Sequence, residues 1–137
     1  MPRLPYKRKI AHDLQKEINR LESGNSDERQ RYGKIAPAIA KVCANPLSLE
    51  FNKNLPDGYK AVDVLQQYRL FFKLEHLDTE SVVFFVWIND EDSIHRSGEP
   101  DDCYAVFRKK LARGEIPKLS PILKQRPLWT PVLSAIS

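Results

Sequence analysis

Three basic or titratable side chains lie close to the ends of two strongly apolar segments in the middle of the chain. Arg69 is the second residue of segment 68–74, and His95 with Arg96 follows segment 82–88. If the two segments are neighbouring strands, these side chains converge on one concave surface. A guanidinium can bind two phosphate oxygens at once, and an imidazole changes its charge near neutral pH. The sequence therefore predicts a phosphate-binding site at this end of a sheet.

The patterns of these segments are those of paired strands. Every second side chain from Tyr68 to Leu74 is apolar, so one strand face is wholly apolar. Residues 82–88 are apolar on both faces, as in a strand that is covered on each side. Residues 59–65 predict a third strand, joined to the next by Gln66-Gln67. We expect an antiparallel sheet over about residues 58–89.

Two amphipathic helical segments precede the predicted sheet. Apolar residues recur every three or four positions in both segments: Ile10, Leu14, Ile18 and Leu21 in the first, and Tyr32, Ile35, Ile39 and Val42 in the second. Pro37 must kink the second helix or mark a restarted first turn. We expect a helical hairpin over about residues 8–44, packed on one face of the sheet.

A further helix is predicted after the sheet, over about residues 102–113. Asp101 or Asp102 can cap its first turn, which contains Tyr104, and Gly114 supplies the stop. The tail, residues 114–137, is rich in proline but too apolar for a free linker. We expect it to wrap the domain or a partner, with a helical turn beginning at Ser120-Pro121.

Composition limits the class of protein. The chain has 137 residues, of which 42% are hydrophobic, enough for the core of one compact domain. It contains neither an apolar run that could span a bilayer nor the apolar centre of a signal peptide, so we expect a cytoplasmic protein. Cys43 and Cys103 are too isolated for a disulfide framework or a zinc site. The basic clusters near the start and at residues 108–113 can attract polyanions, although a solvated helix face is the more common explanation of any single cluster.

Several runs occur together in a fixed order over the middle and later two-thirds of the chain. They are Tyr-Arg-Leu-Phe-Phe at 68–72, Trp-Ile-Asn-Asp-Glu at 87–91, Gly98, Asp-Cys-Tyr-Ala-Val-Phe at 102–107 and Leu-Ala-Arg-Gly-Glu-Ile-Pro at 111–117. This succession resembles the YhaV family of bacterial toxins, in the RelE/ParE superfamily. The resemblance implies a single RelE-like α+β domain over residues 1–137. It also implies a toxin that inhibits translation by cleaving messenger RNA, on the ribosome or free, and a cognate PrlF-like antitoxin.

The resemblance also indicates the site, residue by residue. Arg69 stands at the family's Tyr-Arg arginine, and Asp102 with Tyr104 stands at its Asp-x-Tyr. Two departures are visible. His95 occupies a position where relatives usually carry arginine, and residues 98–102, Gly-Glu-Pro-Asp-Asp, replace Gly-x-Lys-Thr-Asp. The gained acid, Asp101, would repel a phosphate unless it caps the helix or pairs with Arg96. We expect an active enzyme whose rate these departures can attenuate.

RNA cleavage of the kind implied by the resemblance needs no metal and no cofactor. A neighbouring 2′-hydroxyl attacks the phosphate, so the enzyme must move protons and stabilise negative charge on the phosphorane. Arg69 suits charge stabilisation, His95 suits proton transfer, and Tyr104 can stack on a base or donate a hydrogen bond. Residues that could hold flanking phosphates are Lys60, Arg96, Arg108 and Lys109.

Some features of the sequence also suggest other functional classes. The run Asp90-Glu91-Asp92 suggests a metal-dependent nuclease, but three consecutive acids in a loop cannot all face one ion. A ParE-like toxin would instead inhibit a protein target by binding it, without hydrolysis. A repressor of its own operon would need a helix-turn-helix pattern that we do not find.

Overall fold

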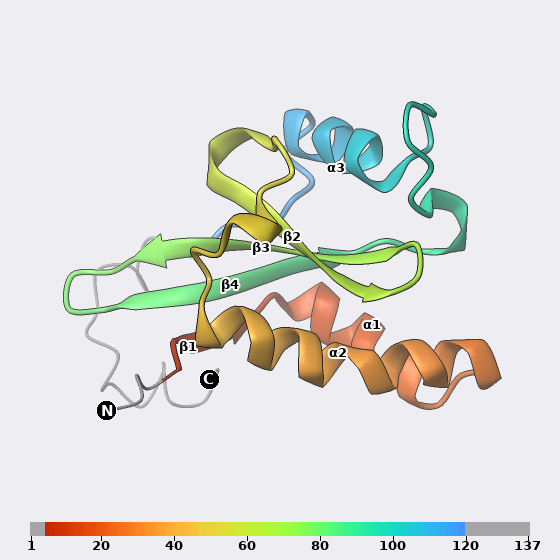
Figure 1. Ribbon diagram of the computed structural model, residues 1–137, viewed down its shortest axis with the longest axis horizontal. Helices are drawn as coiled ribbons and strands as arrows, with labels where there is room; N and C mark the ends of the chain where they lie inside the picture. Colours follow the sequence, from red (N-terminus) through yellow and green to blue (C-terminus); the bar gives the residue numbers. More distant parts are fainter. Residues whose placement is uncertain (1–4, 120–137) are drawn as a thin grey trace.

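The computed structural model describes residues 5–119 (Figure 1). Its strands are β1 (Lys7–Ile10), β2 (Tyr59–Leu65), β3 (Tyr68–His76) and β4 (Ser81–Ile88). Its α-helices are α1 (His12–Glu22), α2 (Ser26–Ala44) and α3 (Cys103–Ala112), and short 3₁₀ turns are η1 (Leu49–Phe51), η2 (Pro56–Gly58) and η3 (Glu91–Ser93). These elements confirm the predicted α+β class.

The sheet is mixed, with the strand order β1-β4-β3-β2. The predicted antiparallel pairs β2–β3 and β3–β4 are present, and Gln66-Gln67 connects the first pair. The prediction of a purely antiparallel sheet is wrong, because β1 pairs with β4 in parallel. Periodicity did not indicate β1, because Ile10 continues the apolar spacing of the following helix while three of the four strand residues are basic. Charged residues of this kind are typical of an edge strand.

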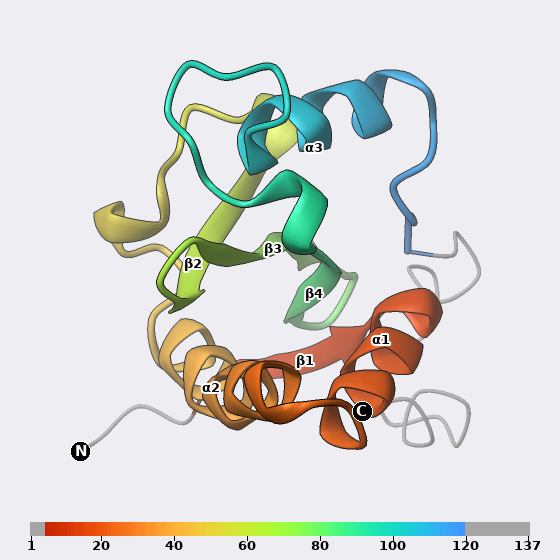
Figure 2. The ribbon, with the colours of Figure 1, turned by 90° about the vertical axis from the view of Figure 1, so that its right-hand side faces the viewer.

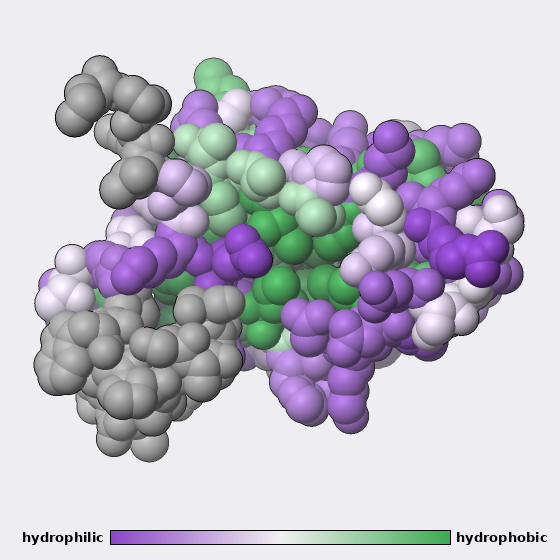
Figure 3. Space-filling view, turned by 90° about the horizontal axis from the view of Figure 1, so that it is seen from below, coloured by the Kyte–Doolittle hydropathy of each residue, from purple (hydrophilic) through white to green (hydrophobic). Residues whose placement is uncertain are grey.

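Helices cover both faces of the sheet (Figures 1 and 2). The predicted helical hairpin is formed by α1 and α2 on one face, but it begins at His12 rather than near residue 8, because β1 occupies those positions. Asn25 and Glu28 form a capping box at the start of α2, which continues through Pro37 as one helix. From below, the side of this hairpin shows a central hydrophobic strip between hydrophilic borders (Figure 3).

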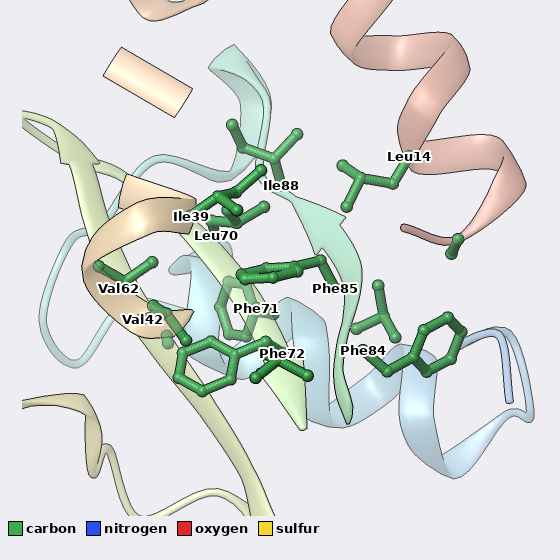
Figure 4. Close-up of a cluster of buried hydrophobic side chains, with 14 of the residues drawn as sticks. Leu14, Ile39, Val42, Val62, Leu70, Phe71, Phe72, Phe84, Phe85 and Ile88 are labelled. Carbon is green, nitrogen blue, oxygen red and sulfur yellow. The ribbon is translucent and has the colours of Figure 1, made fainter. Parts of the chain in front are cut away.

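A register shift between β3 and β4 places aromatic side chains of β4 on both faces of the sheet. Phe71 pairs with Trp87 while Phe72 pairs with Phe85, so the strands slip by one residue between these pairs. Phe85 therefore faces the helical hairpin with Phe72, at a ring distance of 5.6 Å (Figure 4). Trp87 lies on the opposite face, 5.1 Å from the ring of Phe71. Phe107 of α3 stacks on Phe71 at 4.4 Å, which fastens α3 to this face.

The helix after the sheet agrees with its prediction to within one residue at each end. Asp102 is its N-cap, and Gly114 follows it with a φ of 71°. The tail begins against the domain, because Ile116 and Leu119 are buried. The predicted helical turn at Ser120-Pro121 lies outside the described residues. Within residues 5–119, no helix is both long and apolar enough to cross a membrane.

The two-residue turn between β2 and β3 requires an unfavourable backbone conformation. Gln66, its first residue, has a φ of 50°, a value at which a residue with a Cβ is strained. Neighbouring groups hold this turn, because Arg69 Nη1 donates to the Gln66 carbonyl at 2.6 Å. The strained residue therefore lies beside the side chain that the sequence indicates as the phosphate ligand.

Substituting glycine for Gln66 is expected to raise the free energy of unfolding by about 1 kcal/mol, because glycine adopts a positive φ without steric cost. Urea denaturation would measure the change. Gln66→Ala is the matched control, since it removes the same polar atoms but keeps a Cβ at positive φ. If the glycine variant is no more stable than the alanine variant, strain at Gln66 is not the cause.

Candidate active site

Three segments that are separate in the sequence meet at the start of β3. Arg69 comes from this strand, His95 from the loop after β4, and Tyr104 from the first turn of α3. The rings of His95 and Tyr104 are 5.2 Å apart and nearly perpendicular. The Tyr104 ring also packs edge-on against Phe71, at 5.7 Å. Tyr104 also interacts with Arg69, so its side chain lies between those of Arg69 and His95.

His95 forms a dyad with Asp102. Its Nδ1 lies 2.6 Å from Oδ1 of Asp102. Asp102 also accepts hydrogen bonds from the backbone N–H groups of Arg96, at 2.7 Å, and Tyr104, at 3.0 Å. Burial opposes ionisation of Asp102, but these hydrogen bonds outweigh it and hold the pKa of the carboxyl below its usual value. An ionised Asp102 can only accept, so Nδ1 of His95 carries the proton and Nε2 is left to accept one.

The guanidinium of Arg69 is held in one orientation. Nη1 donates to the carbonyls of Gln66, at 2.6 Å, and Tyr68, at 3.0 Å. Nε is 2.9 Å from Oδ1 of Asp63 but is not aligned with it, so this contact is an ion pair without a hydrogen bond. Only 12% of the side chain is exposed. Because Nη1 is bound to two carbonyls and Nε is enclosed, Nη2 is the nitrogen left to serve both the Tyr104 hydroxyl and an anion.

Tyr104 is a hydrogen-bond donor rather than a base. Burial raises the pKa of its hydroxyl, and the smaller opposing effect comes from a hydrogen bond and the charge of Arg69. The phenol therefore keeps its proton at neutral pH, beside the guanidinium. Together, a proton acceptor at His95, a cation at Arg69 and a donor at Tyr104 can serve the three tasks of phosphate-ester cleavage.

The other basic residues indicated by the sequence differ in their partners and exposure. Arg96 pairs with Asp101 at 3.2 Å, and both side chains are half exposed. Arg108 lies one helical turn after Tyr104 and reaches the carbonyl of Asn54, while Lys109 is exposed beside it. Lys60 does not join the site.

The position of Lys60 follows from the alternation of side chains along β2. Asp63, opposite Arg69, shares the α3 face with Phe71 and its partner Ala61. Lys60 therefore projects to the other face, where it donates to the side chain of Asn52. Its predicted contact with phosphate beside Arg69 has no support in this geometry.

One possible set of metal ligands occurs within the described part of the chain. Donor atoms of His95, Asp102 and Cys103 lie within 4.8 Å of one another. Cys103 is fully buried, and burial together with the charge of Asp102 raises the pKa of its thiol to about 12. Metal binding needs a thiolate and free carboxylate lone pairs, whereas this thiol is neutral and Asp102 already accepts three hydrogen bonds. The donors fit a hydrogen-bonded dyad better than a metal site.

Comparison with known proteins decides the family. A family described as "Toxin with endonuclease activity, of toxin-antitoxin system", the YhaV toxins, matches residues 8–126. This chain belongs to the YhaV toxin family. Curated members that it resembles are "Ribonuclease toxin YhaV" of Escherichia coli K12 and "Toxin YhaV" of Escherichia coli O157:H7, each 41% identical over 51 residues. This alignment covers 37% of the chain and 32% of each relative, so the chain matches about a third of their length. No solved structure matches the chain.

The structure shows how the residues around the start of α3 are paired. Asp101, the acid gained before the helix, is paired with Arg96 and does not cap the helix. Asp102 does cap it, through a hydrogen bond from the Tyr104 N–H. His95, at the position where the resemblance leads us to expect arginine, is bound to this capping carboxylate. His95 and Asp102 thus form a His–Asp pair at the start of α3.

Sequence reasoning about the YhaV motifs missed three residues around the site: Asp63, Gln67 and Asn89. Asp63 pairs with Arg69, and Gln67 exchanges hydrogen bonds with the backbone of His95. Asn89 is buried and accepts a hydrogen bond from the Arg69 N–H. The only signal in the sequence was the position of Asn89, a polar residue directly after a wholly apolar strand.

Proposed function

We propose that this chain is the toxin of a type II toxin–antitoxin system and cleaves messenger RNA as a metal-independent endoribonuclease, which inhibits translation. Membership of the YhaV family supports the class of function. The observation that carries the mechanism is the His95–Asp102 dyad beside Arg69 and Tyr104. The proposal includes one RelE-like domain over residues 1–137, acting in the cytoplasm.

Each side chain has one role in the proposed reaction. Nε2 of His95 accepts the proton of the 2′-hydroxyl, whose oxygen then forms a bond to phosphorus. Arg69 stabilises the additional negative charge on the phosphorane. As the bond from phosphorus to the 5′ oxygen breaks, Tyr104 gives that oxygen its proton. Arg69 assists this step because its charge favours the phenolate that remains.

Cleavage of RNA by the purified chain is the direct test. A defined messenger RNA would be incubated with the chain in EDTA, with and without ribosomes, and the ends of the products would be mapped. We expect cleavage that leaves 2′,3′-cyclic phosphate ends in at least one arm. Intact RNA in both arms, with growth arrest in cells, would favour the ParE-like alternative of an inhibitor that binds a protein target.

Binding to RNA should depend steeply on salt, because Arg69, Arg96 and Arg108 displace cations from the phosphate backbone. The affinity for a non-cleavable RNA would be measured at salt concentrations from about 50 to 300 mM. Arg108→Ala should reduce the slope of log affinity against log salt by about 1. Lys60→Ala, on the other sheet face, should leave the slope unchanged. Equal effects of the two substitutions would contradict binding of RNA on the sheet face that α3 covers.

The proposed partners are messenger RNA, free or on the ribosome, and a cognate antitoxin resembling PrlF. The description of the YhaV family as part of toxin–antitoxin systems supports an antitoxin. Co-expression of the neighbouring open reading frame should restore growth, and the two proteins should co-purify. Restored growth without a complex would indicate control of expression instead.

A further inference from the structure

Asn89 is the buried polar residue that connects the two sides of the candidate site. It follows β4 directly, and only 1% of it is exposed. Its Oδ1 accepts from the Arg69 N–H at 2.6 Å. Its Nδ2 donates to the carbonyls of Gln67, at 3.1 Å, and Ser93, at 2.8 Å. A flipped amide would oppose donor to donor and acceptor to acceptor, so these partners fix its orientation.

The location of Asn89 follows from the register of the sheet. Leu70 pairs with Ile88 at the end of the β3–β4 ladder, so Asn89 lies next to Arg69 where the two strands separate. The chain then leaves the sheet and forms η3. At this point the side chain of Asn89 supplies the acceptor that the backbone no longer offers to the Arg69 N–H. The start of β3 therefore stays rigid after its neighbouring strand has ended.

The same amide reaches His95 through one intermediate residue. The Gln67 carbonyl accepts from Asn89 and also from the backbone N–H of His95, at 2.9 Å. In return, Nε2 of Gln67 donates to the His95 carbonyl at 3.2 Å. Asn89 and Gln67 thus connect the backbone of Arg69 to the backbone of His95. These hydrogen bonds involve no contact of Asn89 with either functional side chain.

We propose that Asn89 is a positioning residue, which fixes Arg69 relative to His95 for catalysis. The inference rests on the proposed function and extends it to a residue with no access to the RNA. A displacement of about 1 Å in a reacting group can reduce the rate about a hundredfold. Because the amide joins the two segments that carry the cation and the base, its loss changes their separation.

Asn89→Asp tests this role with minimal change in shape. It keeps the acceptor for Arg69 but places a carboxylate oxygen against the carbonyls of Gln67 and Ser93. We expect kcat for RNA cleavage to fall about 30-fold or more, with KM changed less than about threefold, because RNA does not touch the residue. Asn19→Asp is the matched control, since Asn19 is exposed on the solvent face of α1 and its side chain pairs only with Gln15 in the described structure.

A double substitution separates positioning from a general loss of folded protein. If Asn89 acts through Arg69, Asn89→Asp should reduce activity by less than about threefold when Arg69 is already alanine. An equal fractional loss in both backgrounds would overturn the proposal. Gln67→Ala, at an exposed position, provides a second variant that preserves the core and should lower kcat in the same direction by a smaller factor.

Amide hydrogen exchange tests the connection without reference to activity. Asn89→Asp should accelerate exchange of the His95 amide at least tenfold while that of Phe85, within β4, stays unchanged. If the natural chain does not cleave RNA, the proposed function fails. The exchange rate of the His95 amide then still tests whether Asn89 connects the two segments. Unchanged exchange at His95, or equal acceleration at Phe85, would then reject Asn89 as the residue that couples the two segments.

Discussion

Replacing Arg69 by alanine is expected to reduce RNA cleavage about a hundredfold, which corresponds to about 3 kcal/mol of transition-state stabilisation. Expression of the natural chain without antitoxin should arrest bacterial growth with cleaved messenger RNA, and Arg69→Ala should relieve this arrest. The expected loss is large because two backbone carbonyls already orient the guanidinium. Its reorganisation therefore costs little free energy as charge develops on the phosphorane.

This experiment needs a control for folding, because Arg69 also stabilises the fold. It donates to the Gln66 carbonyl in the β2–β3 turn and pairs with Asp63. Circular dichroism and thermal unfolding would verify that Arg69→Ala remains folded. Arg69→Lys keeps a positive charge without the planar fork and should recover only part of the activity. Arg113→Ala, an exposed substitution at the end of α3, is the matched control and should remain toxic. Persistent arrest by folded Arg69→Ala would refute the assigned role.

Substituting glutamine for His95 is expected to lower kcat at least a hundredfold while changing RNA affinity little. Glutamine retains a hydrogen bond to Asp102 but cannot accept the proton of the 2′-hydroxyl. A general base that accepts a proton makes kcat depend on pH, and glutamine has no ring nitrogen that can take this role. The pH dependence of kcat should therefore be weaker in His95→Gln than in the natural chain, as measured with a short RNA substrate over a range of pH.

Two further variants define what His95 contributes. His76→Gln is the matched control, because His76 also makes an Nδ1 contact, to Ser81 at 2.9 Å, but lies at the far end of β3. It should leave both rate and pH profile unchanged. His95→Arg restores the residue expected from the family resemblance. A faster enzyme would show that charge, rather than proton transfer, limits this member, and wild-type behaviour of His95→Gln would make the residue structural.

Most elements of the fold could be predicted from local patterns. Period-two alternation located β2 and β3, a continuous apolar run located β4, and capping and stop signals located α3. The strand β1 could not be predicted, because its pairing with β4 depends on residues more than seventy positions away and its single apolar residue fits the helical period that follows. The register shift between β3 and β4 was equally hidden, since both Phe85 and Trp87 satisfy an apolar pattern on either face.

By itself, the sequence determined which chemistry this protein can offer. The residue types, the position of Arg69 at a strand start, and the motifs shared with YhaV toxins indicated the cation, the titratable group and the class of activity. Only the tertiary structure decided how these groups act on one another. In the fold, His95 contacts the helix cap Asp102 and Asp101 pairs with Arg96. Lys60 lies on the sheet face opposite the one that carries Arg69.

The physical reason lies in the range of the interactions. Periodicity, capping and turn preference depend on neighbours within a few residues, so a single sequence contains them. The orientation of Arg69 and His95 depends instead on hydrogen bonds through Asn89, which are satisfied only after β3, β4 and the β2–β3 turn have packed together. No spacing rule identifies such a buried amide in advance, because its partners are backbone groups that every residue possesses.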